Sequence, residues 1–107
     1  MDSTSLLIDF LLKKYKSEKK YTLQVIEQLS DEDIVWTPTP ESNSIANIVA
    51  HIWGTVHQRI ENALFNIPDT RDRDKEFERG LRLSKDQALE LITKSFDRII
   101  EVPCQLI

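Results

Sequence analysis

Apolar residues recur every three or four positions along almost the whole chain, and this spacing constrains the fold more than any other feature. Such a period places apolar side chains on one face of an α-helix. Strands on a half-buried sheet would instead alternate apolar with polar residues, and no stretch longer than a few residues does so. The 107 residues contain only 2 glycines. We therefore expect an all-α fold, organised as a single domain over residues 1–107.

The first predicted helix runs from about Thr4 to Leu29. Lysines occupy its outer face, which we interpret as solvated. Ser30, followed three residues later by Asp33, predicts a short helical turn. The two prolines within residues 37–40 then predict an extended connector, because a residue before proline avoids the helical region. The inner face of this first helix is expected to hold Ile8, Leu11, Leu12, Tyr15, Thr22, Val25, Ile26 and Leu29.

The second predicted helix begins at one of the three capping residues at positions 42–44 and continues to about Leu64. Asparagine and proline within residues 66–68 are expected to stop it. Because its apolar stripe is wide, we expect this helix to be central and buried on more than one side. Trp36 and Trp53 are expected to anchor the core. The stripe consists of Ile45, Val49, Ile52, Val56, Ile60 and Ala63, widened by Ile48, Trp53 and Leu64.

Residues 69–82 are rich in charges of both signs and predict a solvated loop, with one helical turn near Phe77. A capping-box pattern over residues 84–87 then starts a third helix, which is expected to reach about Glu101 and to end at Pro103. Its apolar face holds Ala88, Leu91, Ile92, Ser95, Phe96, Ile99 and Ile100. Residues 102–107 are too few to build another helix with a face of its own, so we expect three long helices.

Composition excludes several classes of function. With 18 acidic and 14 basic side chains the net charge is -4, which argues against a protein that binds nucleic acid by neutralising phosphates. Residues 1–16 have neither the basic start of a signal peptide nor the apolar length of a membrane span. The lone Cys104 fits a reducing compartment, so we expect a cytoplasmic protein. Serine and cysteine nucleophiles lack any signature, and the catalytic residues stay unknown.

Both histidines lie on the second predicted helix. At about 100° per residue, His51 and His57 are about 240° apart around its axis, so they cannot hold one metal ion together. We expect His57 to be partly exposed. His51 shares a polar stripe with Asn47, Gly54, Thr55, Gln58 and Glu61 or Asn62. Such a stripe inside a bundle can line a site; alternatively it faces water, or His51 bonds a backbone carbonyl.

Two segments together resemble the DinB-like family of metal-dependent helical bundles: the connector Trp36-Thr37-Pro38-Thr39-Pro40 and the stretch from Asn43 to Gly54. In that family a W-x-P-type connector precedes a helix that begins N-S-I, and a histidine six to eight residues further on is a metal ligand. His51 occupies that position. Residues 71–78 also resemble the loop after the second helix in an uncharacterised branch of the family, so the resemblance covers most of residues 4–101.

The resemblance implies an up-down-down-up helical bundle, frequent homodimers and a divalent metal, nickel or zinc, held by three histidines. In some members it also implies transfer of a small thiol onto a substrate. The other two ligands of the family come from an H-x-x-x-H pair on the last helix, and no histidine follows His57 in this chain. We therefore expect a bundle that is shortened at its C-terminus and lacks the fourth helix, with His51 as its one metal ligand.

Two functions remain open at this point. The first is a protein of the metal-dependent hydrolase or transferase class that has an incomplete histidine site and acts on an unknown small molecule. The second is a non-catalytic helical module that self-associates through an exposed apolar groove. Both predict a homodimer, because a missing helix leaves apolar surface for a second copy to cover.

Overall fold

The computed structural model describes residues 2–104, and all regular secondary structure in that range is helical, as the apolar spacing predicts. Three long helices account for most of it: α1 (Ser3–Glu27), α3 (Ile45–Val56) and α6 (Lys85–Cys104). Short elements connect them: α2 (Asp31–Val35), the π-helical turn η1 (His57–Asn62), α4 (Ala63–Phe65) and α5 (Arg73–Glu76). None of these helices is long and apolar enough to cross a membrane.

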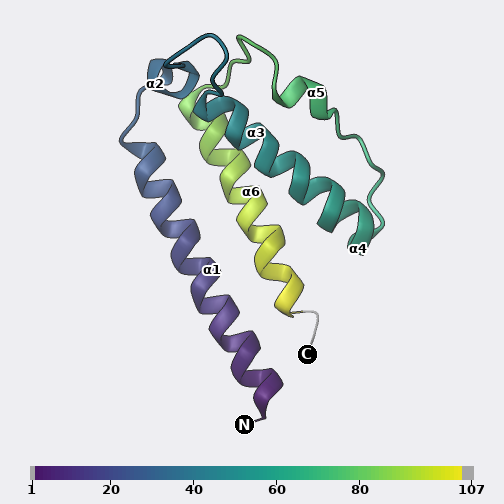
Figure 1. The fold of residues 1–107 in the computed structure, drawn as a ribbon. Helices are drawn as coiled ribbons and strands as arrows, with labels where there is room; N and C mark the ends of the chain where they lie inside the picture. Colours follow the sequence, from purple (N-terminus) through teal and green to yellow (C-terminus); the bar gives the residue numbers. More distant parts are fainter. Residues whose placement is uncertain (1, 105–107) are drawn as a thin grey trace.

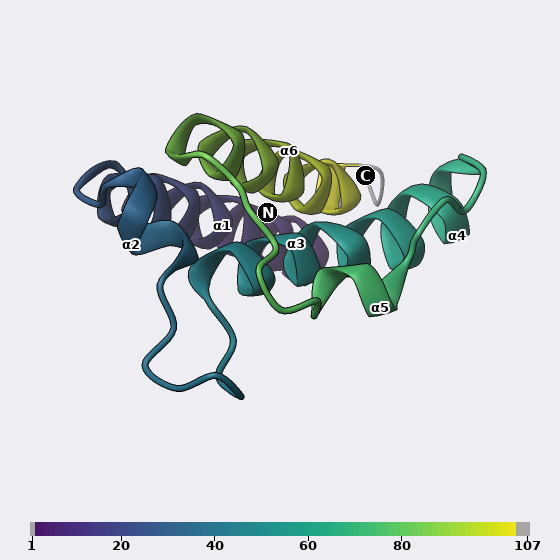
Figure 2. The same cartoon turned by 90° about the horizontal axis from the view of Figure 1, so that it is seen from above.

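Helix α6 lies between α1 and α3 and packs against both (Figure 1). Helices α1 and α3 make no close backbone contact with each other. The segment that carries α5 lies on the outer side of α3, away from α1, as Figures 1 and 2 both show. The three long helices therefore form an open bundle, in which α1 and α3 each keep a face that no other described helix covers.

The core lies where the end of α1, the turn α2 and the beginnings of α3 and α6 meet. Its fully enclosed residues include Ile34, Ala46, Ala88 and Ile92. The two alanines have small side chains, so α3 and α6 approach each other closely at this end. Burial of a side chain the size of Ile34 stabilises a fold by about 1.5–3 kcal/mol.

Local signals in the sequence set the helix boundaries. The side chain of Ser44 accepts a hydrogen bond from the backbone N–H of Asn47, and the side chain of Asn47 accepts one from the backbone N–H of Ser44. This capping box fixes the start of α3 at one of the three predicted positions. Asn66, with a φ of 57°, closes the far end in the left-handed conformation that asparagine tolerates.

Several burial predictions are wrong because the bundle is open. Val25 on α1, and Ile48, Ala63 and Leu64 in and after α3, are all exposed. Apolar spacing predicts that these side chains are buried, but this holds only where another helix packs against each apolar face. Helix α1 packs mainly on α6, and no helix covers the flank of α3 that carries Ile48.

Trp36 does not anchor the core, since it is 66% exposed. Helix α2 ends at Val35 and directs Ile34 inward, so the extended backbone at Trp36 turns this side chain outward. Trp53 is half-buried and lies under the ammonium group of Lys94, whose Nζ is 4.4 Å from the ring centroid. The anchor beside the proline connector is therefore the smaller Ile34.

Two further boundaries differ from the predictions. Helix α6 continues through Pro103 to Cys104 instead of ending at the proline. Pro103 has no N–H to donate to the carbonyl of Ile99, but it lies one residue before the end of α6, so the lost hydrogen bond affects only the last turn. The helical turn predicted near Phe77 lies just before it, as α5, because the side chain of Asp72 accepts a hydrogen bond from the backbone N–H of Lys75 and caps the turn.

Candidate functional site

The candidate site forms where the segment from Asp69 to Glu78 crosses the outer face of α3. The side chain of Asn47 begins this junction, since its amide donates to the backbone carbonyls of Glu76 and Glu78 over 2.8 and 3.1 Å. The residue that caps α3 therefore also holds the α5 segment. One buried side chain therefore holds the loop in a fixed position on a helix that is far from it in sequence.

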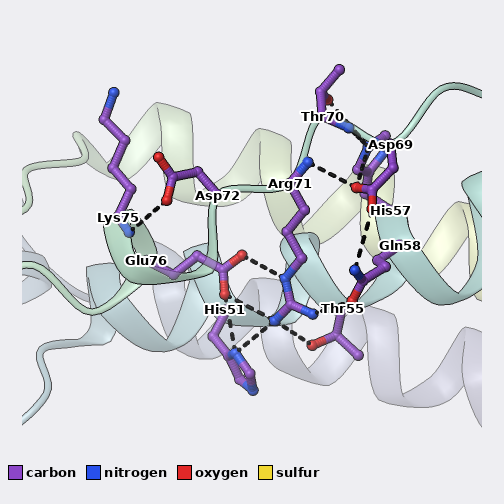
Figure 3. Close-up of polar contacts among 10 residues, drawn as sticks. All are labelled: His51, Thr55, His57, Gln58, Asp69, Thr70, Arg71, Asp72, Lys75 and Glu76. Carbon is purple, nitrogen blue, oxygen red and sulfur yellow. Dashed lines mark hydrogen bonds and ion pairs between the residues drawn. The ribbon is translucent and has the colours of Figure 1, made fainter.

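An ion pair between Arg71 and Glu76 lies at the centre of this junction (Figure 3). The Arg71 guanidinium donates through Nε to Oε2 of Glu76 at 2.9 Å and through Nη2 to Oε1 at 3.0 Å. Both side chains are only 8% exposed. A third donor, Nη1, binds Oε1 of Gln58 at 2.8 Å. This two-point geometry is the strong form of an arginine–carboxylate contact, and it joins the loop to the helix.

The charges of the pair are stabilised by each other. Burial alone would raise the pKa of Glu76, but hydrogen bonds and positive charge from Arg71, with a smaller contribution from His51, hold that pKa below its ordinary value. The same bond to Glu76 raises the pKa of Arg71 despite its burial. Both groups are therefore charged near neutral pH.

Gly54 provides the space for this ion pair. A Cβ atom at this position would collide with the carboxylate of Glu76 and would lie 2.9 Å from Nε of Arg71. A glycine in the middle of a helix costs about 1 kcal/mol relative to alanine. In this position it allows a carboxylate and a guanidinium to lie directly against the helix backbone.

His51 is oriented by the same carboxylate. Its Nδ1 lies 3.2 Å from Oε1 of Glu76, and its ring packs on Phe77 with 5.0 Å between centroids. A carboxylate only accepts hydrogen bonds, so Nδ1 is the donor in this contact. The side chain is 40% exposed, and no hydrogen bond to Nε2 is found within residues 2–104.

His57 is buried rather than partly exposed as predicted. Its Nε2 accepts a hydrogen bond of 2.9 Å from the backbone N–H of Thr70, and its Nδ1 lies 2.9 Å from Oε1 of Glu61. One nitrogen accepts and the other donates, so the geometry is that of a neutral imidazole. The reason for the difference is the loop, which folds back over the π-helical turn and covers this ring. His57 thus has a structural role, because its hydrogen bonds anchor the loop to the helix.

Glu61 connects His57 to the third long helix, α6. Its Oε2 accepts a hydrogen bond of 2.6 Å from Nε of Arg98 on α6. Burial raises its pKa, but the bonds to His57 and Arg98 outweigh that effect and lower it. A π-helical turn is rare and often marks a functional or packed site. In this chain it carries His57 toward the loop and Glu61 toward α6.

An open cavity of about 640 Å³ lies beside His51. The side chains around it come from α3, the π-helical turn and the α5 segment, and all are polar or basic. They are His51, Thr55, Gln58, Arg59, Arg71 and Arg73. This side of α3 is the predicted polar stripe, and Asn47, His51, Thr55 and Gln58 all face the loop as that stripe requires. Glu61 faces α6 instead.

The sequence interpretation missed Arg71 and Glu76, which it placed in a solvated loop. The charged residues of this segment resemble those of an exposed loop. Their positions in the sequence do not indicate that these two side chains contact α3. One signal was present: Gly54 interrupts an otherwise strong helix pattern. Such a glycine indicates a close approach by another group, although it does not say which one.

The described residues do not form a complete metal site by themselves. Within residues 2–104, no three His, Cys, Asp or Glu side chains gather where they could hold one ion. His51 offers a single imidazole nitrogen, whereas zinc takes about four ligands. Nη2 of Arg71 also lies 3.4 Å from Nδ1 of His51 and brings positive charge to the inner side of the ring.

Comparison with family models gives a match over nearly the whole chain. The model of the family described as "Protein of unknown function (DUF1572)" matches residues 2–102. No curated protein and no solved structure matches the chain.

Replacing Gly54 with Ala tests how this site is packed. Alanine favours a helix by about 1 kcal/mol, yet we expect the variant to be less stable by about 3 kcal/mol, because its Cβ displaces Glu76 from a buried charge pair. Urea unfolding followed by circular dichroism measures the change. The control combines Gly54→Ala with Glu76→Ala, and this double variant should be no less stable than Glu76→Ala alone. Additive losses would contradict the collision.

Proposed function

The chain belongs to the DUF1572 family of proteins of unknown function, and from this premise and the geometry around His51 we propose that it is a DinB-like protein of the metal-dependent hydrolase or transferase class. In this proposal Nε2 of His51 is the metal ligand that the domain contributes. The remaining ligands come from Glu or Asp side chains or from a neighbouring chain. The observation that carries the proposal is the anchored ring of His51, whose Nδ1 is held by Glu76 and whose side chain lines the cavity.

This arrangement is the one that metal-binding histidines commonly have. A ligating imidazole usually donates its other N–H to a carboxylate or a carbonyl, which fixes the ring and makes the ligating nitrogen more basic. Glu76 fills that role for His51, and Arg71 holds Glu76 in place. A divalent metal such as nickel or zinc would act there as a Lewis acid. The residues described supply the oriented ring and the cavity beside it.

Calorimetric titration of the metal-free protein with zinc and with nickel tests this proposal. We expect wild-type protein to bind with micromolar affinity or better, and His51→Ala to lose at least tenfold in affinity, since each 1.4 kcal/mol of lost interaction is about tenfold. The control is His57→Gln, whose amide can still accept from Thr70 and donate to Glu61.

His57→Gln should keep the affinity of wild type, provided that its circular dichroism shows a folded protein. Absence of binding to the wild-type protein would contradict the proposal. So would equal losses in the two histidine variants.

A second candidate function is self-association as a helical module. Exposed apolar residues on one side of α1 favour it, in two patches that Lys14 and Glu18 separate. Leu7, Phe10, Tyr21 and Val25 are separated by steps of three, eleven and four residues, which bring each back to nearly the same side of a helix. All four are between 46% and 68% exposed. The face of α1 that packs on α6 is a different one, which carries Ile8 and Ile26. Exposed apolar patches are typical of surfaces that another protein covers.

Light scattering at micromolar concentration tests this second candidate. We expect the mass of a dimer for the wild-type protein and a monomer for Phe10→Glu, because a buried carboxylate without a partner is costly. Lys16→Glu places the same side chain on the opposite side of α1 and should leave the dimer intact. A wild-type monomer would exclude self-association at that concentration and contradict the proposal.

A further inference from the structure

The cavity beside His51 is lined by three arginines that come from two different segments of the chain. Arg59 lies on the π-helical turn, while Arg71 and Arg73 lie at the beginning of the α5 segment. The ion pair of Arg71 with Glu76 holds these segments together, so the guanidinium groups converge for a structural reason. The cavity is therefore locally basic although the chain as a whole has a net charge of -4.

Two of the three positive charges have no partner in the described part of the chain. Arg59 and Arg73 are exposed, and no carboxylate lies within ion-pair distance of either one. The carboxylates that touch the lining residues are Glu76, which binds Arg71, and Asp69, which accepts a hydrogen bond of 3.3 Å from Nε2 of Gln58. Neither of these carboxylates is among the residues that line the cavity.

Neutral hydrogen-bonding groups complete the lining. Thr55 contributes a hydroxyl, whose Oγ1 lies 3.5 Å from Nη2 of Arg71, and Gln58 contributes an amide that is held by Arg71 and Asp69. In Figure 3 the guanidinium of Arg71 lies between Thr55 and His51. Planar guanidinium groups recognise phosphate and carboxylate oxygens through pairs of parallel N–H donors. The volume of about 640 Å³ lies in the range of roughly 300–1,000 Å³ that small-molecule sites occupy.

We propose that this cavity binds a small molecule that carries phosphate or carboxylate groups, through Arg59 and Arg73 with Thr55 and Gln58 beside them. The acidic net charge and the limited size of the cavity favour a small anion over a nucleic acid, whose backbone needs an extended basic surface. The inference deepens the proposed function, because it gives a substrate class to the cavity of His51. It rests on that proposal only for the location, since anion binding by these arginines requires no metal.

Isothermal titration of metal-free protein, at low ionic strength and in a cationic buffer, tests the proposal. The probes are inorganic phosphate, pyrophosphate and citrate, which separate phosphate from carboxylate recognition. We expect saturable binding of at least one probe that weakens as salt is added. The double variant Arg59→Gln with Arg73→Gln should bind that probe at least tenfold more weakly, because it loses two charge-assisted hydrogen-bond donors.

The matched control is Arg79→Gln with Arg82→Gln, which removes two positive charges from exposed positions that do not line this cavity. It should bind like the wild type. No saturable binding of any probe, or an equal loss in the two double variants, would overturn the proposal. Because the experiment contains no metal, its failure leaves the metal titration of His51 unaffected, and the reverse holds as well.

Discussion

The ion pair between Arg71 and Glu76 is the interaction on which the rest of the site depends. Two buried charges bridge a loop and a helix, and they lie directly against the backbone of α3 because Gly54 has no side chain. Removal of either partner would leave the other charge buried alone, which costs about 3–5 kcal/mol. The segment from Asp69 to Glu78 therefore has one favoured position, although it is short of apolar residues and rich in charge.

The position of His51 and the shape of its cavity follow from this pair. Glu76 uses one oxygen to hold both Arg71 and Nδ1 of His51, so the imidazole is fixed by the group that fixes the loop. Arg73 and Arg59 then face one cavity from two segments. The ion pair between Arg71 and Glu76 thus positions both the proposed metal ligand and the proposed anion site. His57, on another side of the helix, attaches the loop to the helix.

Much of this fold follows from local patterns. The period of the apolar residues gives three long helices, and the capping residue Ser44 gives the start of α3. Errors arise where burial depends on distant neighbours: Trp36 and Ile48 are exposed because no helix covers them. The polar stripe places His51 on the correct side of α3. The roles of Arg71 and Glu76 were not predicted, because an ion pair packed against a distant helix leaves no repeating pattern in the sequence.

Stability measured against pH tests the central role of this pair most directly. The pKa of Glu76 is below its ordinary value of 4.5 in the folded protein, so its stabilising effect is present above that pH and is lost as pH falls through the folded pKa. We predict that wild type exceeds Glu76→Gln in unfolding free energy by about 3 kcal/mol near neutral pH, and that the difference shrinks below about pH 4.5. Parallel curves for the two proteins would contradict this account.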